Sequence, residues 1–422
     1  MRLLYVCSDF GIPPAGTKGP SIHLRSITGA LCAKGHECVL LSPKDGPGGD
    51  HPLTRLLEAG CPPAEREAKG LKRWLRSHGY SEALGRELRP LLYNPWVYKR
   101  ALEALRAKRV DCIIERLSLF GHSGVDLAEA LDLPLVLEVN ALLTEESRAF
   151  RSLQLGPLAE QMEDRALSRA DAVIVVSEPL AERVAQRGVD REKIHVVSNG
   201  VNVELFDAAP SRRACRDELG LADQFTVGFV GTLKVWHGVN VLLDAFTRLH
   251  KADASTRLLI VGTGPMEEKL RQAARLDGIE DAVTFAGAVE HARVPYYVRA
   301  MDVAVAPYLS FDGFYFSPLK LFEYMAANTC LVASRLGQIE RIVHDGVDGI
   351  LCKPDDADDL CSQIRELKQD SDLRDSLAQR ARQEVLDHHT WNHAAGKTLR
   401  VIDDVLAARA ASRPRLEAGA TR

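Results

Sequence analysis

The stretch Thr226-Val-Gly-Phe-Val230 is a short apolar run that leads directly into Gly231. A continuous run of this length is typical of a strand that is buried on both faces of a parallel sheet. In the segment that follows, apolar residues recur at the period of a helix, at Val241, Leu242, Ala245, Phe246 and Leu249. The stretch therefore predicts a strand, a glycine loop and a helix in succession, which is the repeating unit of an α/β protein.

The same alternation of apolar runs and amphipathic segments extends along the whole chain. Ten further runs occupy residues 3–7, 38–41, 112–114, 135–139, 172–176, 258–261, 283–285, 303–306, 331–333 and 349–351. Between the first two runs, Ile22, Ile27, Ala30 and Leu31 follow helical spacing. The pattern predicts doubly wound parallel sheets that are covered by helices.

The 422-residue chain is long enough for two or three domains of ordinary size. The strand pattern restarts after Ser198-Asn199-Gly200-Val201-Asn202, which is rich in turn residues, and after the polar segment 208–215. We therefore predict an N-terminal domain over residues 1–205 and a C-terminal domain over residues 206–390. A last helix is expected over residues 391–411, and the small, polar tail 412–422 is expected to be disordered.

Composition and charge exclude several classes of protein. Hydrophobic residues make up 46% of the chain and charged residues 27%, and the net charge of −4 gives no general attraction for nucleic acid. The first apolar run is too short for a signal peptide, and no stretch approaches the ~20 apolar residues of a spanning helix. Nine scattered cysteines without a CxxC pair are typical of reduced thiols. We expect a cytoplasmic protein that has neither disulfides nor a zinc site.

Residues 66–109 differ from the rest of the chain in charge. They hold twelve Lys or Arg residues against four Glu, and five aromatic residues lie among them: Trp74, Tyr80, Tyr93, Trp96 and Tyr98. One interpretation is a pair of surface helices with solvated charged faces. The other is a basic, aromatic patch that contacts the acceptor or the inner face of a membrane.

Two glycine-rich stretches resemble nucleotide-binding loops of other enzyme classes. Gly11-Ile-Pro-Pro-Ala-Gly16-Thr17-Lys18 is similar to a P-loop, but its Thr and Lys stand in the reverse order. Gly262-Thr-Gly264 follows a predicted strand, but Glu267 occupies the place of the third glycine of a dinucleotide fingerprint. The sequence therefore supports neither a P-loop NTPase nor an ordinary dehydrogenase.

Two predicted helix starts are candidates for phosphate binding. The first is at Gly19, because a helix is expected to open at Pro20-Ser21 and its free N–H groups attract anions. This loop could equally be an ordinary connection between strand and helix. The second is Phe314-Tyr-Phe-Ser317-Pro318-Leu319-Lys320-Leu-Phe-Glu323, in which Ser317 and Pro318 are predicted as N-cap and first helical residue.

This second helix start has the groups that a nucleotide diphosphate requires. The amides of Leu319 and Lys320 could hold a phosphate, and the Lys320 side chain adds positive charge. Glu323 lies one turn further along, on the same face as Leu319, and could bind both hydroxyls of a ribose. The alternative is a capped amphipathic helix with an incidental Glu.

The stretch from Phe314 to Ala327 resembles the signature of glycosyltransferase family four. Other segments are similar to parts of the same family and occur in the same order. They are Ala172-Val-Ile-Val-Val-Ser177-Glu178 (last strand of the first domain), Val197-Ser-Asn199-Gly200-Val-Asn202 (linker), Gly231-Thr-Leu-Lys234-Val-Trp236-His237-Gly238 (diphosphate loop), and Leu258-Leu-Ile-Val-Gly262-Thr-Gly264-Pro265 with Phe285-Ala-Gly287 (strands beside the nucleotide base).

The resemblance implies the α/β fold called GT-B, in which two Rossmann-like domains face each other across a cleft and the last helix crosses back to the first domain. It also implies transfer of a sugar, with retention at the anomeric carbon, from a nucleotide diphosphate sugar to a hydroxyl acceptor. The leaving diphosphate can take the acceptor's proton, and neither a metal nor another cofactor is expected. The acceptor would be a saccharide, a lipid-linked glycan or a small molecule.

The resemblance also assigns roles to individual residues of this chain. The catalytic candidates are Lys234, His237 and Asn140. The donor diphosphate is expected at Gly19, Thr232, Ser317, Pro318, Leu319 and Lys320, the nucleoside at Gly262, Gly264, Gly287 and Glu323, and the donor sugar at Tyr315 and Phe316. His237 has an ordinary pKa of about 6.5, and we expect a bound diphosphate to raise that pKa.

The chain departs from the family pattern at several positions. Tyr315 stands where the family often has a first Glu, Thr232 and His237 stand where it often has Arg and Lys, and Asn140 stands where it often has His. These departures leave the identity of the sugar and of the catalytic residue open. Two alternatives therefore remain, a GT-B sugar-nucleotide epimerase and a non-catalytic subunit that binds a nucleotide sugar.

Overall fold

A computed structural model describes residues 1–16, 18–43, 54–55, 63–150, 152–221, 224–311 and 314–412. The chain forms two compact units. Unit 1 comprises Met1–Ser198 and Ala394–Arg422, and unit 2 comprises Asn199–His393. The predicted boundary near residue 205 falls inside a short helix of unit 2, α8 (Val203–Asp207). The predicted tail lies, apart from Ser412, outside the described residues.

Unit 1 is built on a parallel sheet of seven strands in the order β3-β2-β1-β4-β5-β6-β7. The bounds are β1 (Arg2–Cys7), β2 (Glu37–Leu41), β3 (Thr54–Arg55), β4 (Cys112–Arg116), β5 (Leu135–Val139), β6 (Ala172–Val175) and β7 (Ile194–Val196). The direction in which strands are added reverses between β1 and β4, which pair in register from Leu3 opposite Cys112 to Cys7 opposite Arg116.

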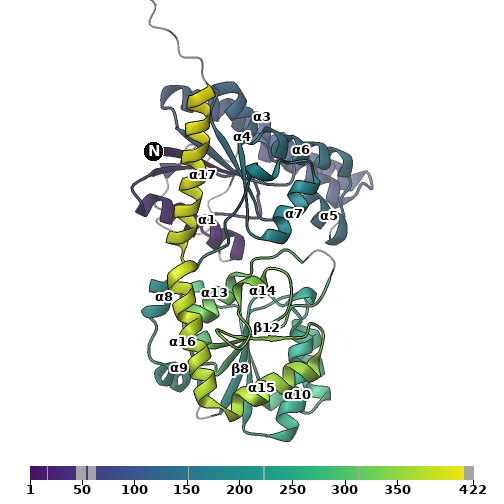
Figure 1. Ribbon diagram of the computed structural model, residues 1–422. Helices are drawn as coiled ribbons and strands as arrows, with labels where there is room; N and C mark the ends of the chain where they lie inside the picture. Colours follow the sequence, from purple (N-terminus) through teal and green to yellow (C-terminus); the bar gives the residue numbers. More distant parts are fainter. Residues whose placement is uncertain are drawn as a thin grey trace, which may run out of the picture. The chain divides into compact units, whose positions relative to one another are not determined.

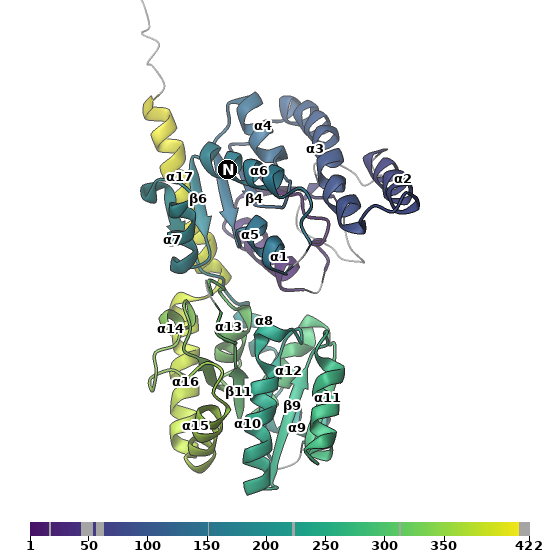
Figure 2. The ribbon, with the colours of Figure 1, turned by 90° about the vertical axis from the view of Figure 1, so that its right-hand side faces the viewer.

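Helices lie on both faces of this sheet (Figures 1 and 2). They are α1 (Gly19–Ala33), α2 (Pro63–Ser77), α3 (Glu82–Ala107), α4 (Ser123–Leu131), α5 (Leu143–Phe150), α6 (Gly156–Arg169) and α7 (Glu178–Gln186), with a 3-10 turn η1 (Arg191–Lys193). The basic, aromatic region folds as the helix pair α2 and α3, which pack side by side (Figure 2). Most of the last helix, α17 (Trp391–Ser412), belongs to unit 1.

Unit 2 repeats this plan with six parallel strands in the order β10-β9-β8-β11-β12-β13. The bounds are β8 (Phe225–Val230), β9 (Thr256–Val261), β10 (Val283–Gly287), β11 (Val303–Ala306), β12 (Cys330–Ser334) and β13 (Ile350–Cys352). Here the strand order reverses between β8 and β11. In a doubly wound sheet, the crevice at the carboxyl ends of the two strands beside the reversal is the usual ligand site.

The helices of unit 2 enclose its sheet between two apolar cores, one containing Phe229 and Phe246 and the other containing Phe322 and Tyr324. The helices that follow α8 are α9 (Arg212–Leu219), α10 (Val239–Ala252), α11 (Glu267–Leu276), α12 (Val294–Ala300), α13 (Leu319–Ala326), α14 (Ile339–Ile342), α15 (Ala357–Gln369) and α16 (Ser371–His388). Three 3-10 turns, η2 (Val235–His237), η3 (Glu280–Ala282) and η4 (His291–Arg293), join the regular elements.

Each of the eleven predicted runs coincides with a strand of one of the two sheets. Two strands were not expected. β3 contains only two residues, and β7 is three residues long with His195 at its centre, so neither carries an apolar run. Both lie at sheet edges, where a strand has one neighbour and needs little apolar surface.

Within unit 2, the segment that enters the unit lies against the segment that leaves it. The amide of Val201 donates to the carbonyl of His389 (2.9 Å), and the amide of Trp391 donates to the carbonyl of Val201 (3.3 Å). Gly200 lies so close that a Cβ atom there would be 2.6 Å from the carbonyl carbon of Thr390. Backbone atoms cannot move aside as a flexible side chain can.

We expect Gly200→Ala to lower the free energy of unfolding by about 1–3 kcal/mol, because the added methyl forces the two segments apart. Gly29→Ala is the matched control. It adds the same methyl inside α1 with no atom within 4 Å, and we expect it to be neutral or stabilising by about 0.5–1 kcal/mol. Chemical denaturation of both variants checks this. If the two variants are equally stable, the close approach of Gly200 to the backbone of Thr390 does not limit the size of the residue at position 200.

Candidate functional site

The predicted site residues are divided between the two units. Gly19 and Asn140 belong to unit 1, and all the others belong to unit 2. Those of unit 2 lie on three loops that follow β8, β9 and β10, and at the start of α13. Since β8 borders the point where the strand order reverses, these loops occupy the place where ligands bind to such sheets.

Backbone contacts hold the three loops against one another. Gly231 N donates to Val261 O (2.9 Å), Leu233 N donates to Thr263 O (3.0 Å), and Gly262 N donates to the carbonyl of Gly287 (2.7 Å). A Cβ atom at Gly262 would lie 2.0 Å from Gly231 O. A Cβ atom at Gly264 would lie 2.5 Å from Leu233 O. Gly262 and Gly264, which were predicted to bind the nucleoside, therefore allow these loops to pack backbone to backbone, whatever ligand they contact.

His237 ends the 3-10 turn η2 in the loop after β8. Its Nδ1 contacts the carbonyl oxygen of Thr232, and its ring meets that of Tyr308 edge-on at 5.3 Å between centroids. Burial, together with the nearby Lys320 ammonium, lowers the pKa of His237 to about 3. The imidazole is therefore neutral at neutral pH, and Nδ1 carries the proton that the carbonyl accepts.

This pKa corrects the expectation that His237 starts from an ordinary value near 6.5. Sequence spacing placed His237 in the loop but could not reveal its burial or the amine beside it. Lys234 and Thr232 lie in the same loop. The Lys234 amine is 4.4 Å from the centre of the Trp236 ring, and Thr232 is exposed.

The second correction concerns the start of α13. The helix begins at Leu319 with Pro318 as its N-cap residue, one position later than predicted, and no side chain caps it. Pro318 has an extended backbone with ψ 115°, so it is the last non-helical residue before α13 and takes the N-cap place that we expected for Ser317. The Ser317 hydroxyl is buried and has no hydrogen-bond partner among the described residues. The amides of Leu319 and Lys320 thus lack a side-chain cap at a site where an anion could bind.

Lys320 is the most unusual residue of this site. Its side chain is buried, at 8% exposure, and its amine has no hydrogen-bond or ion-pair partner within the described parts of the chain. The amine lies 4.0 Å from the centre of the Phe229 ring and 4.9 Å from that of Tyr308. Burial lowers the pKa of Lys320 to about 7. A buried cation without a counter-ion is costly, so an anionic ligand here would be stabilised strongly.

The Lys320 amine also reaches the loop after β8. A Cβ atom at Gly231, the first residue of that loop, would lie 2.9 Å from it. One small region is therefore bordered by the Lys320 amine, by the uncapped amides of α13 and by the loop after β8. This region has positive charge and N–H donors and, among its described residues, no carboxylate within hydrogen-bond distance of the amine.

Glu323 lies one turn further along α13 and is mostly buried. Its Oε1 is 3.0 Å from Nε2 of His291, which belongs to η4 and which sequence reasoning missed. Its Oε2 has no partner in the described chain. One carboxylate oxygen is therefore held in place and the other is available to a ligand hydroxyl.

The two predicted sugar-binding residues differ in exposure. Tyr315 is buried at 6% exposure, whereas Phe316 is partly exposed and packs against Phe311 and Phe314 at centroid distances of 5.8 and 5.4 Å. Asn199 supports this segment from the linker, since its Nδ2 donates to the carbonyl of Ser317 (2.7 Å). The backbone that leads into α13 is therefore fixed by a residue that is distant in sequence.

In unit 1, Asn140 follows β5 and lies beside a buried carboxylate, Glu138. Oε1 of Glu138 accepts from Asn140 Nδ2 (2.6 Å) and Arg116 Nη1 (3.1 Å), and Oε2 accepts from the Tyr5 hydroxyl (2.9 Å). His23 Nε2 also lies 2.9 Å from Oε1. Burial opposes ionisation of Glu138, but His23, Arg116 and Asn140 outweigh it and lower the pKa to about 2.

Sequence reasoning identified Asn140 but missed the rest of this cluster. A signal was present, because Glu138 stands inside an apolar run and Arg116 stands at the end of another. Charged residues at such positions are rarely buried unless they are paired. Gly19 opens α1, as predicted, and no side chain caps that helix either.

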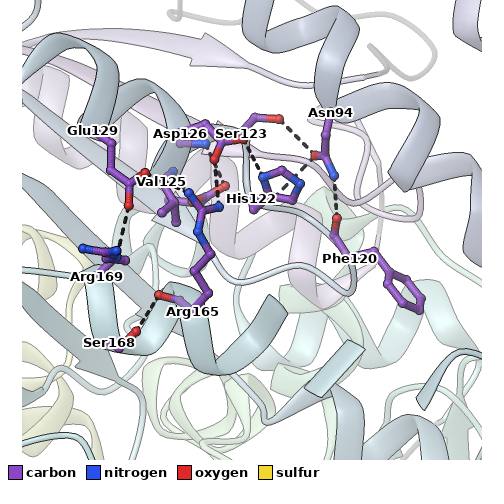
Figure 3. A network of polar contacts seen from close by, with 12 residues as sticks. Asn94, Phe120, His122, Ser123, Val125, Asp126, Glu129, Arg165, Ser168 and Arg169 are labelled. Atoms are coloured by element: carbon purple, nitrogen blue, oxygen red, sulfur yellow. Dashed lines mark hydrogen bonds and ion pairs between the residues drawn. The ribbon is translucent and has the colours of Figure 1, made fainter. Parts of the chain in front are cut away.

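The loop after β4, on the other side of the strand reversal in unit 1, is backbone-strained. Phe120 is buried and has a φ of +61°, which is uncommon for a bulky residue. Figure 3 shows how Asn94 of α3 holds this loop. Its Nδ2 donates to Phe120 O (2.7 Å), and its Oδ1 accepts from the Ser123 hydroxyl (3.0 Å). Strain of this kind clusters at functional sites.

The same network continues from α4 to α6 (Figure 3). His122 Nδ1 lies 2.6 Å from Asp126, and Arg165 bridges Asp126 and Glu129, each at 2.8 Å. These ion pairs anchor the end of the strained loop to two helices.

In the described ranges, no group of three or more His, Cys, Asp or Glu side chains is arranged to hold a metal ion. None of the described helices has the length and apolar character needed to cross a bilayer.

Two family models match the chain. The model described as "Glycosyltransferase Family 4" covers residues 17–205, and the model described as "Glycosyl transferases group 1" covers residues 224–370. Among curated proteins, a glycogen synthase of Mycobacterium tuberculosis is 26% identical over 95% of this chain and 94% of its own length. A D-inositol 3-phosphate glycosyltransferase of Arthrobacter is 26% identical over 86% of this chain and 85% of its own. A phosphatidyl-myo-inositol mannosyltransferase of Mycolicibacterium smegmatis is 32% identical over 55% of this chain and 57% of its own.

Solved structures of GT-B glycosyltransferases share the fold. Anabaena HepE, solved in complex with UDP, superposes with a TM-score of 0.71 at 19% identity over 96% of this chain and 100% of its own. A sucrose-phosphate synthase of Thermosynechococcus elongatus gives 0.70 at 21% identity over 96% and 99%. These structures share the fold, whereas the two family models, which together match residues 17–205 and 224–370, and the near full-length curated relatives show that the chain belongs to glycosyltransferase family four.

Proposed function

We propose that the protein is a retaining glycosyltransferase that moves a sugar from a nucleotide diphosphate sugar to a hydroxyl acceptor. The observation that carries the proposal is the buried, unpartnered amine of Lys320, next to the uncapped start of α13 and the loop after β8. A diphosphate supplies the negative charge and the oxygen acceptors that this arrangement lacks. The solved relative that was crystallised with UDP and the one crystallised with UDP-glucose make UDP the first nucleotide to test.

Several predicted residues of unit 2 have a defined task in this proposal. Lys320, the amides of Leu319 and Lys320, and Lys234 bind the diphosphate. Glu323 binds the ribose through its available oxygen. Neutral His237 accepts a hydrogen bond through Nε2 and does not serve as a cation.

In the proposed reaction, negative charge moves onto the leaving diphosphate. The bond between the anomeric carbon and the diphosphate oxygen breaks, and negative charge develops on the leaving diphosphate, where Lys320 and the helix amides stabilise it. The diphosphate takes the proton of the acceptor hydroxyl, whose oxygen bonds to the same face of the anomeric carbon. No step requires a metal ion or a strong protein base.

The direct test is donor binding followed by donor breakdown. We expect UDP to raise the melting temperature more than ADP or GDP, and at least one UDP-sugar to release free sugar slowly without acceptor. A non-catalytic binding subunit would bind but release nothing. An epimerase would change the configuration of the sugar before any release. Failure of every nucleotide diphosphate to bind would exclude the proposed function.

The pKa of Lys320 predicts how UDP binding depends on pH. Below pH 7 the free amine is mostly protonated, so the amine itself adds little pH dependence there. Above pH 7 the amine must regain a proton on binding, so affinity should fall by about tenfold per pH unit until the higher pKa of the bound state is reached. Titrations from pH 7 to 9 check this, since the terminal phosphate of UDP is already ionised there.

Lys320→Met should lower UDP affinity at pH 7 and abolish the slope. Lys234→Met is the matched control, because it removes a lysine from the same site but should retain the slope. His237→Ala should retain the slope as well, since protonating a group with a pKa of about 3 at pH 7 would cost several kcal/mol. If UDP affinity still falls with pH in Lys320→Met, the titrating group is not Lys320.

We also propose that the enzyme acts in the cytoplasm, at an anionic membrane surface that α2 contacts. Trp74 and Tyr80 are exposed, at 52% and 54%, and their rings stack at 6.2 Å between centroids. The cations Arg66, Lys69, Arg73 and Arg76 are exposed on the same helix. Exposed aromatic rings among cations are typical of helices that lie in the interfacial region of a bilayer.

Trp74→Ala combined with Tyr80→Ala should weaken sedimentation with vesicles that contain anionic lipids by at least about threefold. UDP affinity should not change. Leu276→Ala removes an even more exposed apolar side chain (80%) from α11 and serves as control. If the double variant binds vesicles as well as the wild type, α2 and α3 are surface helices with solvated charged faces and do not contact a membrane.

A further inference from the structure

The side-chain amide of Asn140 is oriented by a group that can only accept hydrogen bonds. Glu138 is buried at 5% exposure, and its carboxylate is ionised at neutral pH, since its pKa is about 2. An ionised carboxylate has no proton to donate. The atom of Asn140 that lies 2.6 Å from Oε1 must therefore be Nδ2.

This orientation leaves the carbonyl oxygen of Asn140 on the other side of the amide. No described residue donates to that oxygen, and Asn140 is partly exposed, whereas Glu138 is not. The residue follows β5, at the carboxyl end of the sheet. A ligand that approaches this end of unit 1 therefore meets a hydrogen-bond acceptor.

Glu138 is itself held by groups from three other elements. Arg116 ends β4, Tyr5 belongs to β1, and His23 belongs to α1. Both oxygens of the carboxylate are engaged, Oε1 by Arg116 and Asn140 and Oε2 by Tyr5. The carboxylate cannot rotate without breaking several of these contacts, so it fixes one orientation of the Asn140 amide.

We infer that Glu138 is a positioning residue that makes Asn140 present its carbonyl oxygen to a sugar hydroxyl. This inference rests on the proposed glycosyl transfer and names the group that unit 1 recognises. A hydroxyl can donate to this oxygen, whereas a phosphate oxygen would be repelled. The hydroxyl belongs either to the donor sugar or to the acceptor, and the test below separates the two.

The competing explanation is that Glu138 only neutralises the buried Arg116. Both explanations predict a loss of stability in Glu138→Gln, so stability does not distinguish them. Activity does, because a positioning residue acts through Asn140 and has no effect once Asn140 is absent. A double-mutant cycle measures this dependence.

The cycle uses Glu138→Gln, Asn140→Ala and the double variant, with kcat/KM for sugar release from the best UDP-sugar as readout. We expect each single variant to lose about tenfold to a hundredfold, with UDP affinity unchanged. In the Asn140→Ala background, Glu138→Gln should cost less than about threefold. Multiplied losses in the double variant would overturn the inference. Tyr5→Phe, which removes a bond to Oε2 only, should lower stability but keep kcat/KM within about threefold.

Donor analogues that lack one hydroxyl at a time identify the source of that hydroxyl. If the hydroxyl belongs to the donor, the analogue that lacks this hydroxyl will have the same kcat/KM with the wild type and with Asn140→Ala. If the variants release sugar from the donor at the wild-type rate and lose activity only in transfer to an added acceptor, the hydroxyl belongs to the acceptor. If Glu138→Gln fails to fold, Glu138→Gln combined with Arg116→Gln keeps the buried site neutral and replaces it in the cycle.

A second measurement does not depend on activity. With 15N-labelled asparagine, the side-chain amide of Asn140 should exchange its protons slowly in the wild type and rapidly in Glu138→Gln. Rapid exchange in the wild type would overturn the inference even if no UDP-sugar is turned over. Slow exchange without UDP binding would instead count against the proposed function alone.

Discussion

Both sheets of this protein consist of parallel strands that are buried on both faces, and this constraint decides where polar chemistry can occur. Because the faces of the strands are buried, a charged side chain on them needs an ion pair or hydrogen bonds to be stable, or it must lie where a strand ends. Arg116 and Glu138 lie at the carboxyl ends of β4 and β5, and the loop that carries His237 leaves the carboxyl end of β8. In both units, the candidate residues lie next to the point at which the strand order reverses.

The two units treat a buried charge in opposite ways. In unit 1, Glu138 is surrounded by donors, and its ionised form is stabilised before any ligand arrives. In unit 2, Lys320 has aromatic rings for neighbours and no ion-pair partner among the described residues, and burial outweighs the more distant charge of Glu323 and lowers the pKa of Lys320 to about 7. The donors around Glu138 fix the orientation of its carboxylate. The Lys320 amine, in contrast, lacks an ion-pair partner among the described residues, and an anionic ligand can supply one. The proposed division of labour between a positioning site and a diphosphate site follows from this difference.

The sequence could predict the fold because its signals are local. Each apolar run stands alone between amphipathic segments, and eleven of the strands could be located without any contact between distant residues. The start of α13 was wrong by one residue because the backbone of Pro318 is extended and not helical, which the residue types alone do not reveal. The pKa of His237 and the partners of Glu138 depend on burial and on residues far away in the chain, which no local pattern encodes. The roles of the site residues came from family resemblance, and they remain proposals.

The backbone contacts among the loops after β8, β9 and β10 bear on how such a site can diversify. The loops are joined through amides, carbonyls and glycines, so none of these contacts involves the side chain of Thr232, Lys234 or His237. Selection can therefore exchange those side chains while the loops keep their positions. Because the backbone frame is separate from these side chains, ligand preference can change by substitution at the three positions without loss of the architecture that holds the loops together.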